Sequence, residues 1–239
     1  MPNRKDYTIG WISAIECEYI AGKAFLDAEH PIPDDLPVND NNVYTLGEIG
    51  KHNVVIATLP SGQYGISSAT AVVKDMLHSF PNIRIGLMVG VGGGAPLYLP
   101  DADEQDIRLG DIVVSKPIDG QSGVIQYDFG KNIQNQEFKL TGFLNQPPPL
   151  LLAAITGLSS QYAMNLHGNG LNGCIDSVLD KYPGLKKDYQ RPDLVSDKLY
   201  RAQVTHPAHA TTGASCATLC GDDPSKLVQR PERPEAGTP

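Results

Sequence analysis

The sequence lacks the features that mark several classes of protein. Its four cysteines are too few and too scattered over 239 residues to form the disulfide framework of a small secreted protein. It has no run of basic residues, and 27 acidic residues outnumber 19 basic ones, which argues against binding to nucleic acid or an anionic membrane. No apolar stretch approaches the roughly 20 residues that cross a bilayer, and no signal-peptide core follows Met1. We therefore expect a cytoplasmic protein whose partner is a small molecule or another protein.

The hydrophobic residues, 41% of the chain, fall into segments with the spacing of strands and helices. Strands are predicted at residues 7–14, 43–49, 53–59, 83–91 and 112–115. Helices are predicted at residues 16–29, 66–80, 150–162 and 174–182. The turn at residues 50–52 indicates an antiparallel hairpin, and the continuous apolar run at 83–91 indicates a central strand buried on both faces. This order predicts an α/β fold, a three-layer α/β/α domain with a mixed central sheet.

Composition divides the chain into a folded region and a short tail. We predict one domain over residues 6–221 and a mobile, proline-rich tail over residues 222–239, which has too little apolar surface to offset its ordering entropy. Cys216 and Cys220 follow two histidines, which are zinc-ligand types, but no second closely spaced pair accompanies them. Two unligated thiols in a loop are the favoured interpretation, so no metal site is predicted.

A glycine-rich loop follows the apolar run at 83–91. Residues 90–95, Gly-Val-Gly-Gly-Gly-Ala, match the G-x-G-x-x-A pattern of dinucleotide-binding folds, and Asp111 lies about twenty residues further on. That interpretation requires a helix to begin at residues 93–95, whereas two prolines and an acidic segment follow the loop. The favoured interpretation is a loop whose bare backbone lets a ligand lie close to the sheet edge.

Six segments occur in a recognisable order over residues 6–231. They are Ile-Gly-Trp-Ile-Ser-Ala-Ile-Glu-Cys-Glu at 9–18, Ser-Gly-Gln-Tyr-Gly at 61–65, the glycine loop at 90–94, Arg-Leu-Gly-Asp-Ile-Val-Val-Ser at 108–115, Gln-Tyr-Asp-Phe-Gly-Lys at 126–131 and Ser-Lys-Leu-Val-Gln-Arg-Pro at 225–231. Together they resemble the nucleoside phosphorylase and nucleosidase superfamily. The fungal version, found alone or at the N-terminus of NLR-like multidomain proteins, is the most similar.

This resemblance implies cleavage of a nucleoside N-glycosidic bond, with a small-molecule nucleoside as substrate and no cofactor. Glu18 matches the glutamate beside the nucleophilic water of the hydrolytic branch, where a carboxylate can orient or deprotonate water. The alternative for Glu18 is an acid favoured by the helix dipole, and Glu16 should point elsewhere on the same turn. The implied substrate-binding residues are Ala14, Gly62, Val91, Gly92 and Gly93.

The sequence also departs from the pattern of the superfamily. The side chains that bind phosphate in the phosphorolytic branch are replaced by Met88 and Val91, which favours water as the nucleophile and leaves phosphate open as a co-substrate. A methionine-glutamate pair for the ribose and an aspartate for the base have no counterpart here. We therefore expect a domain incomplete at its C-terminus, weak or absent turnover, and self-association into a homo-oligomer. A non-catalytic nucleoside-sensing or scaffold module of the NLR-like type is the alternative.

Overall fold

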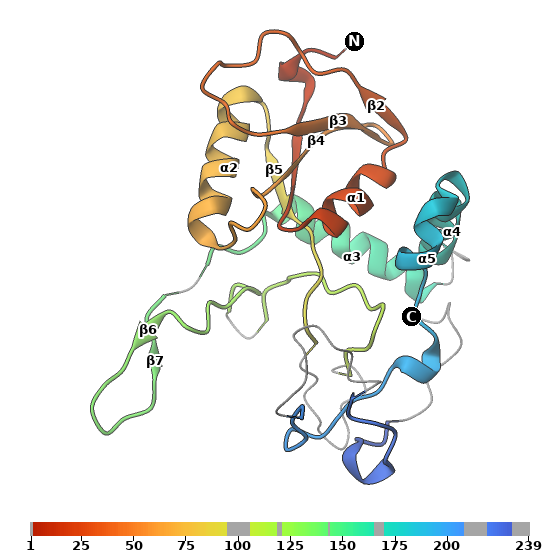
Figure 1. Ribbon diagram of the computed structural model, residues 1–239. Coiled ribbons are helices and arrows are strands. Elements are labelled where there is room, and N and C mark those ends of the chain that lie inside the picture. Colours follow the sequence, from red (N-terminus) through yellow and green to blue (C-terminus); the bar gives the residue numbers. More distant parts are fainter. Residues whose placement is uncertain are drawn as a thin grey trace. The chain divides into compact units, whose positions relative to one another are not determined.

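The computed structural model describes residues 2–94, 106–118, 121–142, 144–164, 170–207 and 219–230. Contacts group the chain into two compact units (Figure 1). Unit 1 comprises Met1–Ala95 and Asp180–Gly184, and unit 2 comprises Pro96–Leu179 and Leu185–Pro239. The predicted site residues all belong to unit 1.

Unit 1 is built on a five-stranded mixed sheet with the strand order β2-β3-β4-β1-β5. The strands span Ile9–Ser13 (β1), Ala28–His30 (β2), Tyr44–Ile49 (β3), His52–Thr58 (β4) and Ile85–Met88 (β5). β1 is parallel to both of its neighbours, with Trp11 paired to Ile56 of β4 and to Leu87 of β5. β3 is antiparallel to both of its neighbours, β2 and β4. The predicted hairpin is confirmed, and Gly50 in its turn has the positive φ of 58° that favours glycine.

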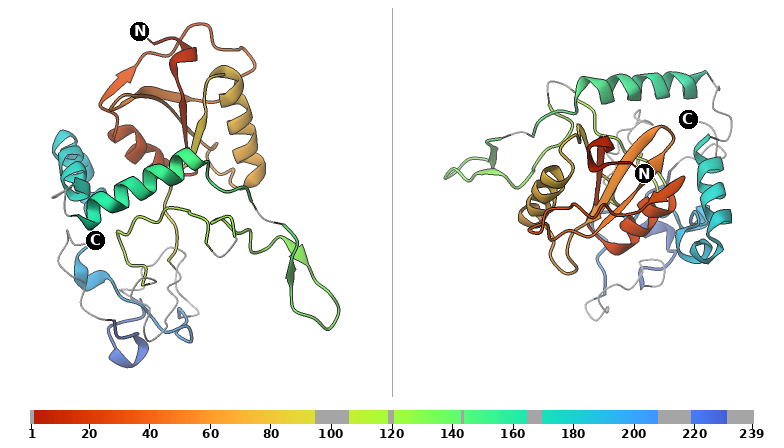
Figure 2. Two further views of the ribbon diagram at one scale, coloured as in Figure 1. Left: turned by 180° about the vertical axis from the view of Figure 1, so that it is seen from behind. Right: turned by 90° about the horizontal axis from the view of Figure 1, so that it is seen from above.

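A helix covers each face of this sheet (Figure 2). The helices are α1 (Glu16–Ala24) and α2 (Ile66–Ser79). Successive strand residues point to opposite faces, so Val55 joins the apolar cluster that contains Met76 of α2, whereas Val54 joins the cluster that Tyr19 of α1 packs against. The predicted α/β fold, with a mixed central sheet and helices on both sides, is confirmed.

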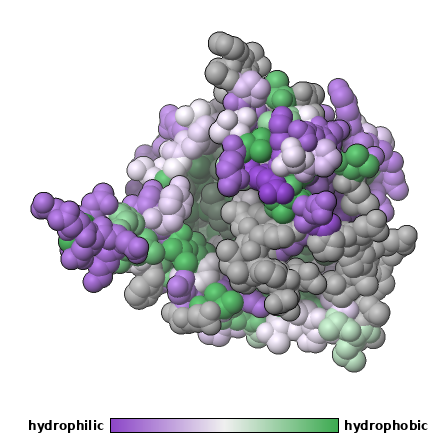
Figure 3. All heavy atoms as spheres, turned by 90° about the horizontal axis from the view of Figure 1, so that it is seen from below, coloured by the Kyte–Doolittle hydropathy of each residue, from purple (hydrophilic) through white to green (hydrophobic). Residues whose placement is uncertain are grey.

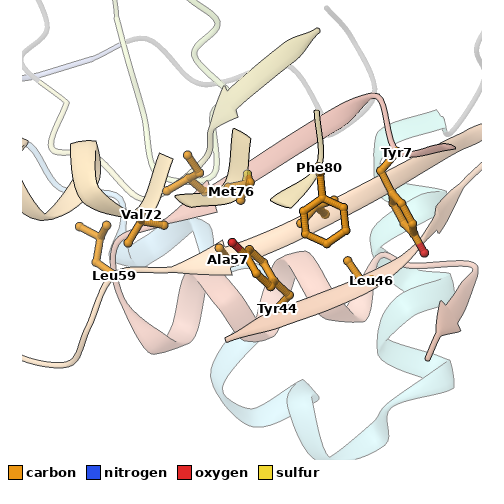
Figure 4. Close-up of a cluster of buried hydrophobic side chains, with 10 residues drawn as sticks. Tyr7, Tyr44, Leu46, Ala57, Leu59, Val72, Met76 and Phe80 are labelled. Carbon is orange, nitrogen blue, oxygen red and sulfur yellow. The ribbon is translucent and has the colours of Figure 1, made fainter. Parts of the chain in front are cut away.

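The larger apolar cluster lies between the sheet and α2 (Figure 4). The ring of Phe80 is fully buried and meets Tyr7 and Tyr44 edge-on, with centroid distances of 5.4 and 5.1 Å. Leu46 and Met76 point into the same cluster. Each such side chain contributes about 1.5–3 kcal/mol by leaving water, so this cluster contributes more to the stability of unit 1 than the smaller apolar cluster does.

A polar cluster fastens the segment before β3 to α2. The carboxylate of Asp40 accepts hydrogen bonds from the hydroxyls of Tyr44 and Ser79, and the side chain of Asn42 donates to Tyr44 and to the carbonyl of Val72. Burial and the bond to Asp40 raise the pKa of Tyr44 above its ordinary value of 10.0. The buried hydroxyls are thus satisfied, and the hydroxyl of Tyr44 keeps its proton.

The first helix is shorter than the sequence indicated. The prediction of a helix over residues 16–29 is wrong at its C-terminal end, because α1 ends at Ala24 and β2 occupies 28–30. The amide of Asp27 donates to the carbonyl of Glu48, which aligns β2 with β3. Leu26, which fits the helical spacing, turns instead into the smaller apolar cluster. Strand pairing therefore outweighs local helix propensity here.

Two strand predictions are corrected. The run at residues 83–91 forms only β5, which is the edge of the described sheet and not a central strand, and Met88 is 65% exposed. Residues 112–115 form no strand, and Ile112, Val113 and Val114 are exposed. β-branched residues favour a strand only where a neighbour offers its backbone for pairing, and none of the described strands does so here.

Unit 2 has little regular sheet structure in its described part. Its elements are β6 (Gly130–Lys131), β7 (Lys139–Leu140), α3 (Pro149–Ala163), α4 (Gly170–Lys181, whose last two residues belong to unit 1) and α5 (Lys186–Tyr189). Short 3₁₀ helices of the chain span Arg4–Asp6, Pro183–Leu185, Leu194–Ser196 and Pro224–Lys226. The predicted helices at 150–162 and 174–182 are confirmed as α3 and α4. α3 has no buried residue. Figure 3 shows hydrophobic and hydrophilic residues interleaved on one face of the molecule.

A cluster of ion pairs holds three segments of unit 2 together. The guanidinium of Arg230 lies 3.2 Å from Asp106 and 2.9 Å from Asp197, and Arg108 lies 2.6 Å from Asp106. All four side chains are largely buried. Burial acts to lower the pKa of Arg230, but its bonds to the two carboxylates outweigh that and raise the pKa above its usual value.

The predicted domain boundaries, 6–221 and 222–239, stay predictions. In the described part of the predicted tail, the amide of Val228 donates to Leu199, and the amide of Arg201 donates to Lys226, both at 2.9 Å. Residues 231–239 lie outside the described residues.

Candidate functional site

The predicted site residues lie where three parallel strands end. β4, β1 and β5 run in the same direction, so their carboxyl ends share one edge of the sheet. The amide of Leu59 after β4 and the amide of Val89 after β5 donate to the carbonyls of Ser13 and Ile12, both at 3.0 Å. In open α/β sheets, ligands bind at this edge, in the loops that follow the strands.

Glu18 occupies the centre of this edge because the chain turns from β1 directly into α1. Its Oε2 accepts the amides of Ala14 at 2.7 Å and Ile15 at 3.1 Å, and its Oε1 accepts the amide of Val91 at 2.9 Å. Ile15 is the N-cap of α1 and Glu18 the third helical residue, so the bond to Ile15 is the glutamate half of a capping box. The bond to Val91 joins α1 to the glycine loop, 73 residues further along the chain.

Gly90 makes this contact possible. A Cβ at this position would lie 2.7 Å from the carboxyl carbon of Glu18 and closer still to Oε1, so the loop and the carboxylate could not keep their present contact. The first glycine of the loop therefore lets the backbone approach the carboxylate, as expected for a glycine that allows close backbone approach.

The other predicted residues are distributed around the same edge. Ala14 and Val91 meet through Glu18, since both donate their amides to its carboxylate. Gly92 and Gly93 continue the loop, are exposed, and have open space where a Cβ would stand. Gly62 lies in the loop after β4 with a φ of 77°, and no described contact joins it to Glu18. Their roles toward a ligand stay predictions.

Glu16 and Glu18 differ as the sequence predicted. Glu16 is exposed at the start of α1, whereas Glu18 is partly buried against the end of β1. Both interpretations of Glu18 are compatible with this geometry, because its carboxylate caps the helix and also lies at the strand ends. About four lone-pair positions belong to a carboxylate, and three are used, so about one remains for water or a hydroxyl.

The alternatives from the sequence can be compared with the described residues. Gly93 and Gly94 are not helical, so no dinucleotide-type helix begins at either, and Ala95 lies outside the described part. Within the described part of the chain, no group of three or more His, Cys, Asp or Glu residues could hold a metal ion. Cys216 and His209, one of the two histidines considered for a zinc site, lie outside the described residues. No helix among the described residues is long and apolar enough to cross a membrane.

Sequence reasoning missed two features of the site. It gave Val91 as an implied substrate-binding residue whose side chain cannot bind an anion, and it did not foresee that the backbone amide of Val91 donates to Glu18. It also gave Gly90 no specific role, although a loop that begins with glycine after a strand signals close backbone approach. Two buried polar atoms of β1, Nε1 of Trp11 and Oγ of Ser13, have no hydrogen-bond partner in the described structure.

The comparisons with known proteins give one relative. Over 154 residues, the chain is 51% identical to a nucleotide-binding leucine-rich repeat (NLR)-like protein of Hyaloscypha variabilis. The aligned part is 64% of this chain but only 15% of that protein, so the chain is similar to a small portion of it. No family model matches the chain. No solved structure matches it either.

Proposed function

We propose that the chain is a nucleoside-binding module of the NLR-like type, with its ligand at the sheet edge where β4, β1 and β5 end. The observation that carries this proposal is the Glu18 carboxylate, which is held at that edge by three backbone amides and connects α1 to the glycine loop. The similarity of the chain to an NLR-like protein supports a module of that type. The resemblance of its loops to nucleoside phosphorylases supports a nucleoside as the ligand.

Each part of the edge would contribute a different contact. The remaining acceptor position of Glu18 suits a ribose hydroxyl, because a hydroxyl donates well to a carboxylate. The backbone of Gly92 and Gly93 carries no side chain, so a flat base can lie close to the sheet. Gly62, in the loop after β4, would close the other end of the site.

Cleavage of the N-glycosidic bond is the second candidate. It is favoured by the position of Glu18, a partly exposed carboxylate with room for one more donor. Such a group can orient or deprotonate water while its charge stabilises a cationic sugar. We rank binding above cleavage because three backbone amides already engage the Glu18 carboxylate, which leaves about one acceptor position for a ligand.

Calorimetric titration of the full chain with purine and pyrimidine nucleosides tests the proposal. We expect saturable binding of one nucleoside class to the wild type and at least about tenfold weaker binding to Glu18→Ala. Binding to Glu16→Ala should be unchanged, since Glu16 is exposed at the start of α1. Assays of released base, with and without phosphate, distinguish cleavage from binding. Absence of binding by all nucleosides would reject the proposed ligand class.

A further inference from the structure

Three backbone N–H groups converge on one point of unit 1. Those of Ala14 and Ile15 lie at the junction of β1 and α1, and that of Val91 lies in the loop after β5. All three are within 3.1 Å of a carboxylate oxygen of Glu18. Converging backbone amides form concave sites for anions, and the start of a helix adds partial positive charge. This point therefore has the chemistry of an anion site, built from two segments far apart in the chain.

The anion that fills this site belongs to the protein itself. Glu18 is the third residue of α1, a position from which a glutamate side chain reaches back over the helix start. A phosphate at the same point would have to displace this carboxylate or lie beside it. Two anions in contact repel each other, by about 1 kcal/mol at 4 Å even in bulk water and by more where water is excluded.

We propose that Glu18 is a positioning residue whose carboxylate occupies a backbone anion nest formed by Ala14, Ile15 and Val91. By doing so it fixes the glycine loop against the end of β1 and closes the nest to phosphate. Resting on the proposed function, this closes the nucleoside site to free phosphate at the position of the nest. The absence of a Cβ at Gly90 is a condition of the arrangement, because with a side chain there the loop and the Glu18 carboxylate could not keep their present contact.

Backbone amide exchange, measured by NMR on the full chain without nucleoside, tests the nest directly. In Glu18→Ala the Val91 amide loses its acceptor, so its exchange should become about tenfold faster or more. Added inorganic phosphate or formate should then slow this exchange again and raise the melting temperature of the variant. Neither anion should change Val91 exchange in the wild type, whose nest is filled. Glu16→Ala is the matched control, since it removes an acid from the same helical turn without touching the nest.

Gly90→Ala provides a second, independent variant. It leaves Glu18 on Ala14 and Ile15 but displaces the loop, so Val91 exchange should accelerate without any response to phosphate. The proposal is overturned if phosphate protects Val91 in the wild type, if Glu18→Ala shows no anion response, or if Gly90→Ala leaves Val91 exchange unchanged. These measurements contain no nucleoside, so failure to bind nucleosides would reject the proposed function while leaving the nest intact.

Discussion

A carboxylate surrounded by backbone amides has a narrower chemical role than an exposed one. Glu18 already accepts three N–H groups, and its orientation is fixed by two segments of the chain. The position that remains can receive one donor from one direction only. Helix capping and the proposed ligand binding are thus not competing interpretations of Glu18, because the bonds that cap α1 would also orient the carboxylate toward the proposed ligand.

Tyr44 gives a prediction about alkaline pH. Burial and the bond to Asp40 raise its pKa above 10.0, the value expected in the unfolded chain, so the folded state binds this proton more tightly. The resulting stability is complete below pH 10 and is lost as the pH rises toward the folded pKa. We expect the free energy of unfolding of the wild type, measured in urea from pH 8 to about 11.5, to fall by up to about 1.4 kcal/mol per pH unit above pH 10 from this group.

Tyr44→Phe is the control for this titration. It removes the ionisable hydroxyl and is less stable than the wild type at pH 8, because Asp40 and Asn42 lose a hydrogen-bond partner. The difference in stability between the two proteins should shrink above pH 10, because only the wild type loses the contribution of Tyr44. The other tyrosines titrate in both proteins, so their effect cancels in the difference. A constant difference up to pH 11.5 would show that Tyr44 keeps an ordinary pKa.

Part of the site was accessible from the sequence and part was not. The position of Glu18 next to a strand end, and the contrast with exposed Glu16, follow from helical spacing and the strand-to-helix transition. The partnership of Glu18 with Val91 does not, because it joins residues 73 positions apart through a backbone amide. Every residue except proline has the same backbone N–H group, so no pattern of side chains in the sequence could indicate which amide donates to Glu18.

At the scale of elements, the local sequence pattern predicted whether a segment forms a helix or a strand better than it predicted the position of a strand in the sheet. The hairpin and α2 were predicted with small errors at their ends, because their apolar spacing and turns are local. The run at 83–91 looked equally apolar on both faces, yet β5 is the edge of the described sheet. The position of a strand in a sheet depends on which other segments pair with it. Residues 112–115 have strand propensity, but none of the described strands pairs with them.

The contact between α2 and the sheet gives a prediction at the same scale. Met76 is 1% exposed and lies in the larger apolar cluster, whereas Leu77, the next residue of the helix, is 47% exposed. Met76→Ala should lower the free energy of unfolding by about 2–5 kcal/mol, because it leaves a cavity in the cluster. Urea denaturation followed by circular dichroism measures this. Leu77→Ala should change it by well under half as much, and equal losses would place α2 differently on the sheet.

At the scale of the molecule, the two units are stabilised by different interactions. Unit 1 has two apolar clusters on either side of its sheet. Among the described residues of unit 2, the buried apolar side chains are only Leu179 and Cys220, while the ion pairs of Arg230 connect segments around Asp106 and Asp197. A largely buried ion pair contributes little net stability by itself, but removal of one partner leaves a charge without compensation.

Arg230→Met tests this division between the units. It keeps the apolar stem but leaves Asp197 without its cation, so the cost should be about 3–5 kcal/mol within unit 2. Hydrogen exchange followed by mass spectrometry should show residues 197–201 exchanging about a hundredfold faster, while β1 and β4, which belong to the core of unit 1, are unchanged. Asp222→Ala is the control, because its ion pair with Lys198 is more exposed and should matter little. Equal acceleration in β1 would mean that the two units unfold together, and unchanged exchange at 197–201 would mean that Arg230 does not hold unit 2.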